Sequence, residues 1–147
     1  MNENFYLKIK LEKDGIKPTR AIDGDAGLDF YCPKDYDIQP WGSVLIPLEL
    51  RTQFPKGYAL IFKEKSGIAT KKNLHIGACV VDSLFRGIVH AHFFNASNNK
   101  IELKRGDKII QGIIIQVWIG DPIIVDNIDM NTERCENGFG STDLKGL

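Results

Sequence analysis

An aspartate at the end of an apolar run is the residue in this sequence best suited to activate a water molecule. Asp82 follows the run Ile76–Val81 and is followed directly by the sequence SLFRG. A carboxylate at a strand-to-turn junction can take a proton from water when a reacting centre lies within reach. It can equally be an Asx-turn carboxylate with a structural role, and the neighbouring residues favour neither interpretation. Phe85, taken alone, is more typical of a core residue than of a platform for a base.

A second candidate is a cation, a hydroxyl and a glycine in succession. Lys65, Ser66 and Gly67 follow the strand-like sequence YALIFKE and open a possible first helical turn. Such a turn aims backbone N–H groups at an anion. The triplet alone favours the alternative, a capped turn whose charge is solvated.

The C-terminal sequence places an aromatic ring among residues that give backbone freedom. Gly138 and Gly140 flank Phe139, and two hydroxyl residues, Ser141 and Thr142, follow. Glycines allow positive φ, and successive N–H groups with hydroxyls can form an anion-binding nest. Phe139 could stack on a planar base, while Arg134 has a charge suited to phosphate. By itself such a sequence is more often a plain disordered chain end.

Two weaker signals complete the set of candidate site residues. Asp29 follows a close backbone approach at Ala26 and Gly27 and, by itself, is a turn acid. The sequence RGDKIIQG reads as a hairpin turn leading into a strand, in which the amide of Gln111 could donate to a phosphate oxygen.

Composition and charge narrow the classes of function. The 147 residues are typical of one domain, and Lys plus Arg equals Asp plus Glu at 19 each, so no overall basic field is available to hold long nucleic acid. The three cysteines form no CxxC pair, and neither a signal peptide nor a long apolar run is present. We therefore expect a soluble protein without membrane contact, in a cytoplasmic setting, which is the host cytoplasm if the source is viral.

Period-2 alternation and short apolar runs predict an all-β fold. One short helix is expected over Ser66–Lys72, and the closely spaced strands without crossover helices indicate an antiparallel sandwich, barrel or jelly roll. After Val125 the composition becomes polar and glycine-rich, which is typical of a mobile tail. The seven predicted strands are Phe5–Leu11, Ser43–Leu50, Tyr58–Phe62, Leu74–Val81, Gly87–Phe94, Lys108–Trp118 and Pro122–Val125.

Taken in order, five segments resemble the five ordered motifs of the dUTPase family. They are AGLDF (26–30), KSGIA (65–69), VVDSLFRG (80–87), RGDKIIQ (105–111) and NGFGST (137–142). The resemblance implies hydrolysis of dUTP to dUMP and pyrophosphate. It also implies a distorted jelly-roll-like β-barrel over residues 1–126 and a flexible C-terminal arm over 127–147, which closes over the active site of a neighbouring subunit. The protein would be a homotrimer with shared active sites.

The resemblance also implies roles for individual residues. Asp82 would orient and deprotonate the water that attacks the α-phosphorus. The backbone of the hairpin at Cys79, Val80 and Val81 would read uracil. Phe85 would lie beneath the deoxyribose and leave no space for a 2′-hydroxyl.

The remaining roles concern the triphosphate. Mg²⁺, the expected cofactor, would bind phosphate oxygens and water without a direct protein ligand. Three residues would support the site without touching substrate, namely Asp29, Arg86 and Asp107. The residues implied to bind the phosphates or to close over the nucleotide are Lys65, Ser66, Gly67, Gln111, Arg134, Phe139, Gly140, Ser141 and Thr142.

The motifs depart from the family pattern at several positions. Glu64 and Lys65 stand where Pro-Arg is usual, and lysine lacks the bidentate fork of arginine. Cys79 replaces a glycine, Leu84 an aspartate and Phe85 a tyrosine. In the last motif Cys135 and Asn137 replace glycines, and Asp143 stands where glycine is common.

Two alternative functions remain open on the sequence. A dCTP deaminase resembles dUTPases in fold and third motif, but it needs a glutamate where this chain has His92 and an Arg-Ser pair where Lys65 and Ser66 stand. A non-catalytic nucleotide-binding or protein-binding relative is the other alternative, and the retained Asp82 argues against it.

Overall fold

The computed structural model describes residues 5–133 and residue 135 of the chain, and within these residues the fold is almost entirely β. It contains eleven strands and one helix, α1, which spans Ser66–Lys72 as predicted. The strands are β1 (Lys8–Leu11), β2 (Leu28–Tyr31), β3 (Tyr36–Ile38), β4 (Ser43–Pro47), β5 (Leu50–Gln53), β6 (Tyr58–Glu64), β7 (Leu74–Ile76), β8 (Val80–Asp82), β9 (His90–Asn95), β10 (Ile101–Leu103) and β11 (Lys108–Gln116).

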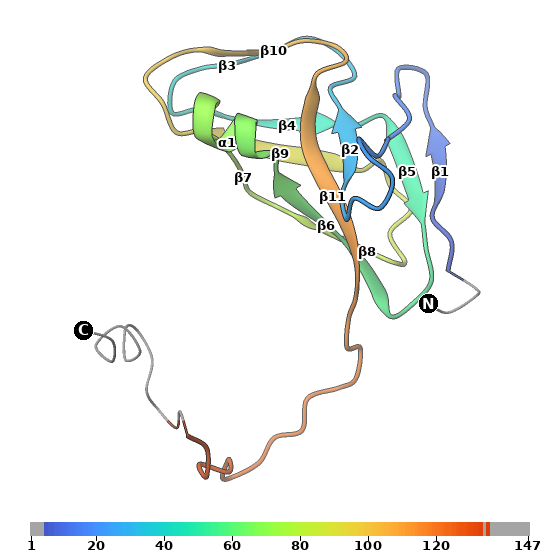
Figure 1. Cartoon of the computed structure of the whole chain (residues 1–147), viewed down its shortest axis with the longest axis vertical. Helices are drawn as coiled ribbons and strands as arrows, with labels where there is room; N and C mark the ends of the chain where they lie inside the picture. Colours follow the sequence, from blue (N-terminus) through green and yellow to red (C-terminus); the bar gives the residue numbers. More distant parts are fainter. Residues whose placement is uncertain (1–4, 134, 136–147) are drawn as a thin grey trace.

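The strands form four antiparallel sheets that wrap around one core (Figure 1). The largest sheet has the order β2-β11-β6-β8, and the next has the order β4-β9-β7. The pairs β1-β5 and β3-β10 complete the set. Phe30 and Phe62 meet edge to face inside, with ring centroids 5.0 Å apart, and Phe93 is also fully buried. The prediction of an antiparallel all-β fold is confirmed.

Two of the seven predicted strands are divided in the structure, and a third does not form. The stretch Ser43–Leu50 is not one strand, because Glu49 adopts a positive φ of 54° between β4 and β5. The stretch Leu74–Val81 is likewise divided at Gly77 into β7 and β8, which lie in different sheets. Residues 122–125 form no strand but an exposed coil, in which Ile124 is 97% exposed. A strand needs a hydrogen-bonding partner, which the apolar pattern of one segment cannot supply.

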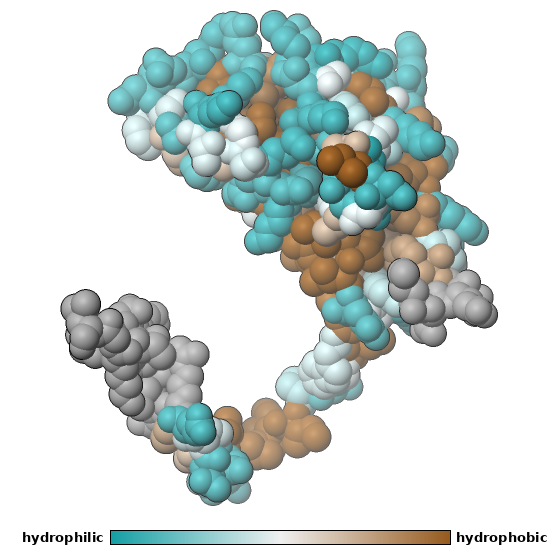
Figure 2. Space-filling view, in the orientation of Figure 1, coloured by the Kyte–Doolittle hydropathy of each residue, from teal (hydrophilic) through white to brown (hydrophobic). Residues whose placement is uncertain are grey.

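The chain leaves the sheets after β11, and the described coil from residue 117 onward runs away from the core (Figure 1). It carries apolar side chains that are exposed in the single chain, as Figure 2 shows. Trp118, Ile119, Ile123 and Ile128 are among them. An apolar surface of this kind is typical of a segment that packs against another chain. No helix in the described part of the chain is long and apolar enough to cross a membrane.

The buried side-chain amide of Asn95, in β9, hydrogen-bonds to the end of β3 and to the loop after β9. The side chain of Asn95 is fully buried, and its Nδ2 atom donates to the carbonyls of Ile38 (3.2 Å), Gln39 (3.0 Å) and Asn99 (2.8 Å). Its Oδ1 atom accepts from the backbone N–H (3.0 Å) and hydroxyl (2.7 Å) of Ser97.

Substitution Asn95→Ala should therefore destabilise the fold, because it leaves buried carbonyls without donors. We expect a loss of about 3 kcal/mol in the free energy of unfolding, measured by urea denaturation. Asn98→Ala is the matched control, since Asn98 is exposed and makes one bond, to the indole of Trp41 (3.0 Å). Equal stability of the two variants would contradict this account of the Asn95 network.

Candidate active site

A pocket of about 220 Å³ lies beside β8, between the residues that precede this strand and the start of β9. It brings together five residues that the sequence analysis selected, namely Cys79, Val80, Val81, Asp82 and Phe85. The remaining lining residues are Phe62, Ala78, Ile88, Val89 and His90. The pocket is mainly apolar with one carboxylate at its edge, which suits a flat ring attached to a charged group.

Strand pairing determines the direction of the Asp82 side chain. β8 pairs with β6 in the register Val80 to Ile61, Val81 to Leu60 and Asp82 to Ala59. Because side chains alternate along a strand, Val81 enters the core while Val80 and Asp82 are exposed. The carboxylate is thus presented to solvent at the end of a short strand, where it can contact a water molecule.

The loop after β8 places the ring of Phe85 in the pocket. Its first turn is closed by the N–H of Phe85, which donates to the carbonyl of Asp82 at 3.1 Å. The ring passes so close to Gly87 that a Cβ atom there would lie 2.4 Å from it. Glycine at position 87 is therefore required for this ring position. Phe85 is 44% exposed, so part of the residue is free to contact a ligand.

A second hollow lies at the opposite end of β6. It is lined by Ser66 and Gly67 at the start of α1, by Lys65 before them, and by Lys108 and Gln111 of β11. Ile68 closes the apolar side. Two cations, a hydroxyl and an amide suit an anionic group such as phosphate.

Asp29 holds the two cations of this hollow in place. It is only 5% exposed, and its Oδ1 atom accepts a hydrogen bond from the ammonium of Lys65, while the ammonium of Lys108 lies 2.9 Å from Oδ2. Burial by itself would raise the pKa of Asp29, but the hydrogen bonds and charges of the two lysines hold the pKa below its usual value. The hydrogen bond to Asp29 correspondingly raises the pKa of Lys108. One carboxylate therefore joins the first, second and fourth motifs.

Gln111 is fixed by the backbone of β6. Its Nε2 atom donates to the carbonyl of Glu64 at 2.9 Å, which leaves a second N–H on the same amide for a ligand. Gly27 allows this position, because a Cβ atom there would lie 2.8 Å from the Gln111 Oε1 atom. The close approach that the sequence indicated around Gly27 is thus directed at Gln111.

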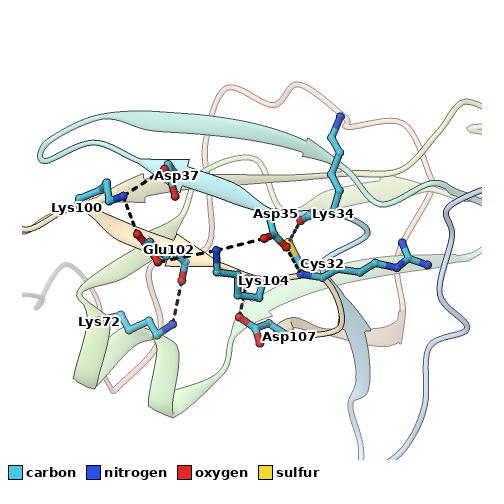
Figure 3. A network of polar contacts seen from close by, with 10 residues as sticks. Cys32, Lys34, Asp35, Asp37, Lys72, Lys100, Glu102, Lys104 and Asp107 are labelled. Carbon is cyan, nitrogen blue, oxygen red and sulfur yellow. Dashed lines mark hydrogen bonds and ion pairs between the residues drawn. The ribbon is translucent and has the colours of Figure 1, made fainter.

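A network of ion pairs and hydrogen bonds fixes the turn that leads into β11 (Figure 3). Asp35 accepts from the backbone N–H of Arg105 at 2.9 Å and from the ammonium of Lys104 at 3.2 Å. Asp107 accepts from the N–H of Lys104 at 2.9 Å, and its carbonyl accepts from the N–H of Cys32 at 2.8 Å. These bonds fix the chain directly before Lys108.

The two hollows are separated within one chain. Asp82 pairs with Ala59 on one side of β6, whereas Gln111 pairs with Lys63 on the other side. Ala59 and Lys63 are four residues apart, which is roughly 13 Å along the strand direction. The structure thus brings together the residues of each hollow but not Asp82 with Gln111.

Some candidates were missed, and others lie outside the described residues. The sequence analysis did not select Lys108 as a site residue, since nothing in the sequence links it to Asp29. It also did not place His90 in a pocket; the Nδ1 atom of His90 lies 2.8 Å from the carbonyl of Ile88. Arg134 and residues 139–142 are not among the described residues.

Comparison with known proteins identifies a consistent set of relatives. The family model described as dUTPase matches residues 13–143. Deoxyuridine 5'-triphosphate nucleotidohydrolase of Arabidopsis thaliana is 36% identical over 138 residues, which cover 94% of this chain and 82% of that protein.

Solved structures give the same result for the fold. A mutant dUTPase of Staphylococcus bacteriophage 80alpha with dUpNHpp has a TM-score of 0.85 and 23% identity, covering 93% of this chain and 98% of that one. A second mutant of that dUTPase with dUpNHpp has a TM-score of 0.83 and 25% identity, covering 92% and 97%.

The Asp29 ion pairs predict a pH-dependent contribution to stability. Because the folded-state pKa of Asp29 is below the unfolded value, this contribution is present above the unfolded pKa and is lost as the pH falls through the folded one. Asp29→Asn should cost about 2 kcal/mol at pH 7, less than a fully buried pair, because both lysines reach solvent.

Chemical denaturation between pH 7 and pH 3 measures both effects. The wild-type protein should lose more stability than Asp29→Asn over this range. Asp37→Asn is the control, because its pair with Lys100 (3.3 Å) is solvent-exposed and should contribute little. A parallel loss in wild type and Asp29→Asn would rule out the proposed contribution.

Proposed function

The chain belongs to the dUTPase family, and we infer that it is a dUTP diphosphatase, which hydrolyses dUTP to dUMP and pyrophosphate. The main structural support for this activity is the pocket beside β8, in which the carboxylate of Asp82 stands among mainly apolar lining residues. We propose that Asp82 orients and deprotonates the water that attacks the α-phosphorus. Its exposure at the end of β8 supports this role, because a general base must reach both water and substrate.

We propose that the base is read by the backbone of Cys79, Val80 and Val81. β8 is an edge strand of its sheet, paired with β6 on one side, so the backbone groups on its other side are available to a ligand. Uracil presents alternating acceptors and a donor along one edge, and an edge strand offers the complementary groups. The ring of Phe85 then lies beneath the deoxyribose, where it excludes a 2′-hydroxyl.

The triphosphate is proposed to occupy the hollow of Ser66, Gly67 and Gln111. Lys65 and Lys108 add positive charge there, although each shares its ammonium with Asp29. The C-terminal arm, residues 127–147, would close over the nucleotide with Arg134, Phe139, Gly140, Ser141 and Thr142, which excludes bulk water.

Mg²⁺ is the proposed cofactor, held by phosphate oxygens and water. The described residues contain no cluster of three potential metal ligands, and the carboxylate of the phosphate hollow, Asp29, is already paired with two lysines. Mg²⁺ binds hard oxygen ligands and retains several waters, which suits a site of this kind. When bound, it neutralises charge on the triphosphate.

We propose a homotrimer in which each active site uses several subunits. Asp82 and Gln111 lie on opposite sides of β6, so one nucleotide would use the β8 pocket of one chain and the phosphate hollow of another. The exposed apolar side chains after β11, such as Trp118 and Ile119, supply surface for contacts between subunits.

Substitution Asp82→Asn tests the catalytic role. We expect kcat for pyrophosphate release from dUTP with Mg²⁺ to fall by about 10³, as for a lost general base, with nucleotide affinity little changed. Asp121→Asn, in the exposed coil, is the matched control and should keep full activity.

The same assay separates the alternative functions. Ammonia released from dCTP would indicate a deaminase instead. His92, which stands where that enzyme needs glutamate, packs its ring against Gly77 rather than offering a carboxylate. Nucleotide binding without turnover of dUTP, dCTP, dTTP or UTP would indicate a non-catalytic protein.

Subunit mixing tests the shared site. Asp82→Asn and Gln111→Ala chains, each with low activity, are unfolded together in equal amounts and refolded. Random assembly into a ring should restore roughly a quarter of wild-type activity, because one site in four then combines two intact contributions. The Asp82→Asn chain mixed with the double variant is the control and should stay inactive. If mass spectrometry detects mixed trimers without restored activity, both residues act within one chain.

A further inference from the structure

Arg51, which no motif contains, connects the β1-β5 sheet to the loop that carries Phe85. The NH1 atom of its guanidinium donates to the carbonyl of Arg86 at 2.8 Å, and its Nε atom donates to the carboxylate of Glu12 at 2.7 Å. Its side chain is 39% exposed; the bond to Glu12 is partly buried, whereas the bond to the Arg86 carbonyl is exposed. The guanidinium is planar, and a carboxylate on one edge fixes the direction in which the other donors point.

Glu12 is itself held by the backbone. Its N–H donates to the carbonyl of Glu49 at 2.9 Å, at the kink between β4 and β5. The Nε side of the Arg51 guanidinium is therefore anchored at the β1-β5 sheet, outside the loop that its NH1 atom contacts.

The loop between β8 and β9 has few other attachments at its tip. Its base is held by Val89, whose carbonyl accepts from the N–H of Leu48 at 2.8 Å and whose N–H donates to the carbonyl of Leu50 at 2.9 Å. The guanidinium of Arg86 donates to carbonyls of the loop itself, those of Ser83 (2.7 Å) and Phe85 (2.8 Å). Among the described residues, Arg51 is the side chain from outside the loop that hydrogen-bonds to residues 83–87.

We propose that Arg51 is a positioning residue that sets the discrimination between deoxyribonucleotide and ribonucleotide. It fixes the carbonyl of Arg86, the residue after Phe85, and thereby restrains the segment of the loop that carries the ring facing the sugar. This inference rests on the proposed function, in which Phe85 lies beneath the deoxyribose. Without Arg51 the tip of the loop is free to move away from the pocket, and space opens for a 2′-hydroxyl.

The test compares kcat and KM for dUTP and UTP in Arg51→Met, which keeps the apolar stem and removes the donors. We expect the ratio of kcat/KM for dUTP over UTP to fall about tenfold, with the change mainly in KM, because Asp82 belongs to β8 and keeps its place. Arg51→Lys should recover part of the ratio, since it retains one charged donor. Glu12→Gln should give an intermediate ratio, because the bond to the Arg86 carbonyl remains.

Lys10→Met is the matched control. Lys10 also pairs with Glu12, at 3.5 Å, but among the described residues it makes no hydrogen bond or ion pair to the loop, so its loss should leave the ratio unchanged. Thermal unfolding of each variant shows whether it is folded, and Glu12→Gln and Arg51→Lys carry the test if Arg51→Met is not.

Two outcomes separate this inference from the proposed function. An unchanged ratio in folded Arg51 and Glu12 variants, with wild-type protein active on dUTP, would overturn the positioning role alone. A wild-type protein inactive on dUTP would overturn the proposed function. Calorimetric binding of dUMP and UMP to the same variants then tests the positioning role without turnover, and equal preference in wild type and Arg51→Met would reject it.

Discussion

A buried carboxylate shared by two lysines is the interaction on which the hollow at the start of α1 depends. Asp29 is nearly inaccessible, and an unpaired charge there would be strongly unfavourable. The requirement for a partner draws Lys65 and Lys108 to one point, although they come from segments far apart in the sequence. Ser66 and Gly67 follow Lys65 directly in the chain, and Gln111 pairs with Asp29 itself in the register of β2 and β11.

Strand β6 lies between the pocket beside β8 and the position of Gln111 on β11. On one side it carries β8, with Asp82 and the apolar pocket, and on the other side β11, with Gln111. In the homotrimer proposed above, a second chain would supply the hollow that one chain does not bring to Asp82. The exposed apolar coil after β11 is consistent with this need for a neighbour.

The departures from the family motifs have local structural explanations at two positions. Lys65 stands where arginine is usual, and its ammonium is bonded to Asp29, so a single directed donor suffices for that role. Phe85 lacks the hydroxyl of the usual tyrosine but keeps the ring, which Gly87 admits into the pocket. The structure offers no comparable account of Leu84, which is simply exposed.

The sequence by itself determined the antiparallel all-β class, the short helix over Ser66–Lys72 and the family, because alternation and ordered motifs are properties of neighbouring residues. Only the tertiary structure decided where strands break, as at Glu49 and Gly77, and that residues 122–125 form none, since pairing depends on a distant partner. It also decided that Asp29 binds Lys108, that Arg51 reaches the Phe85 loop and that Asp82 lies away from Gln111. Each of these findings relates residues that are far apart in the sequence, and the spacing of residues along the chain does not show which of them meet in the fold.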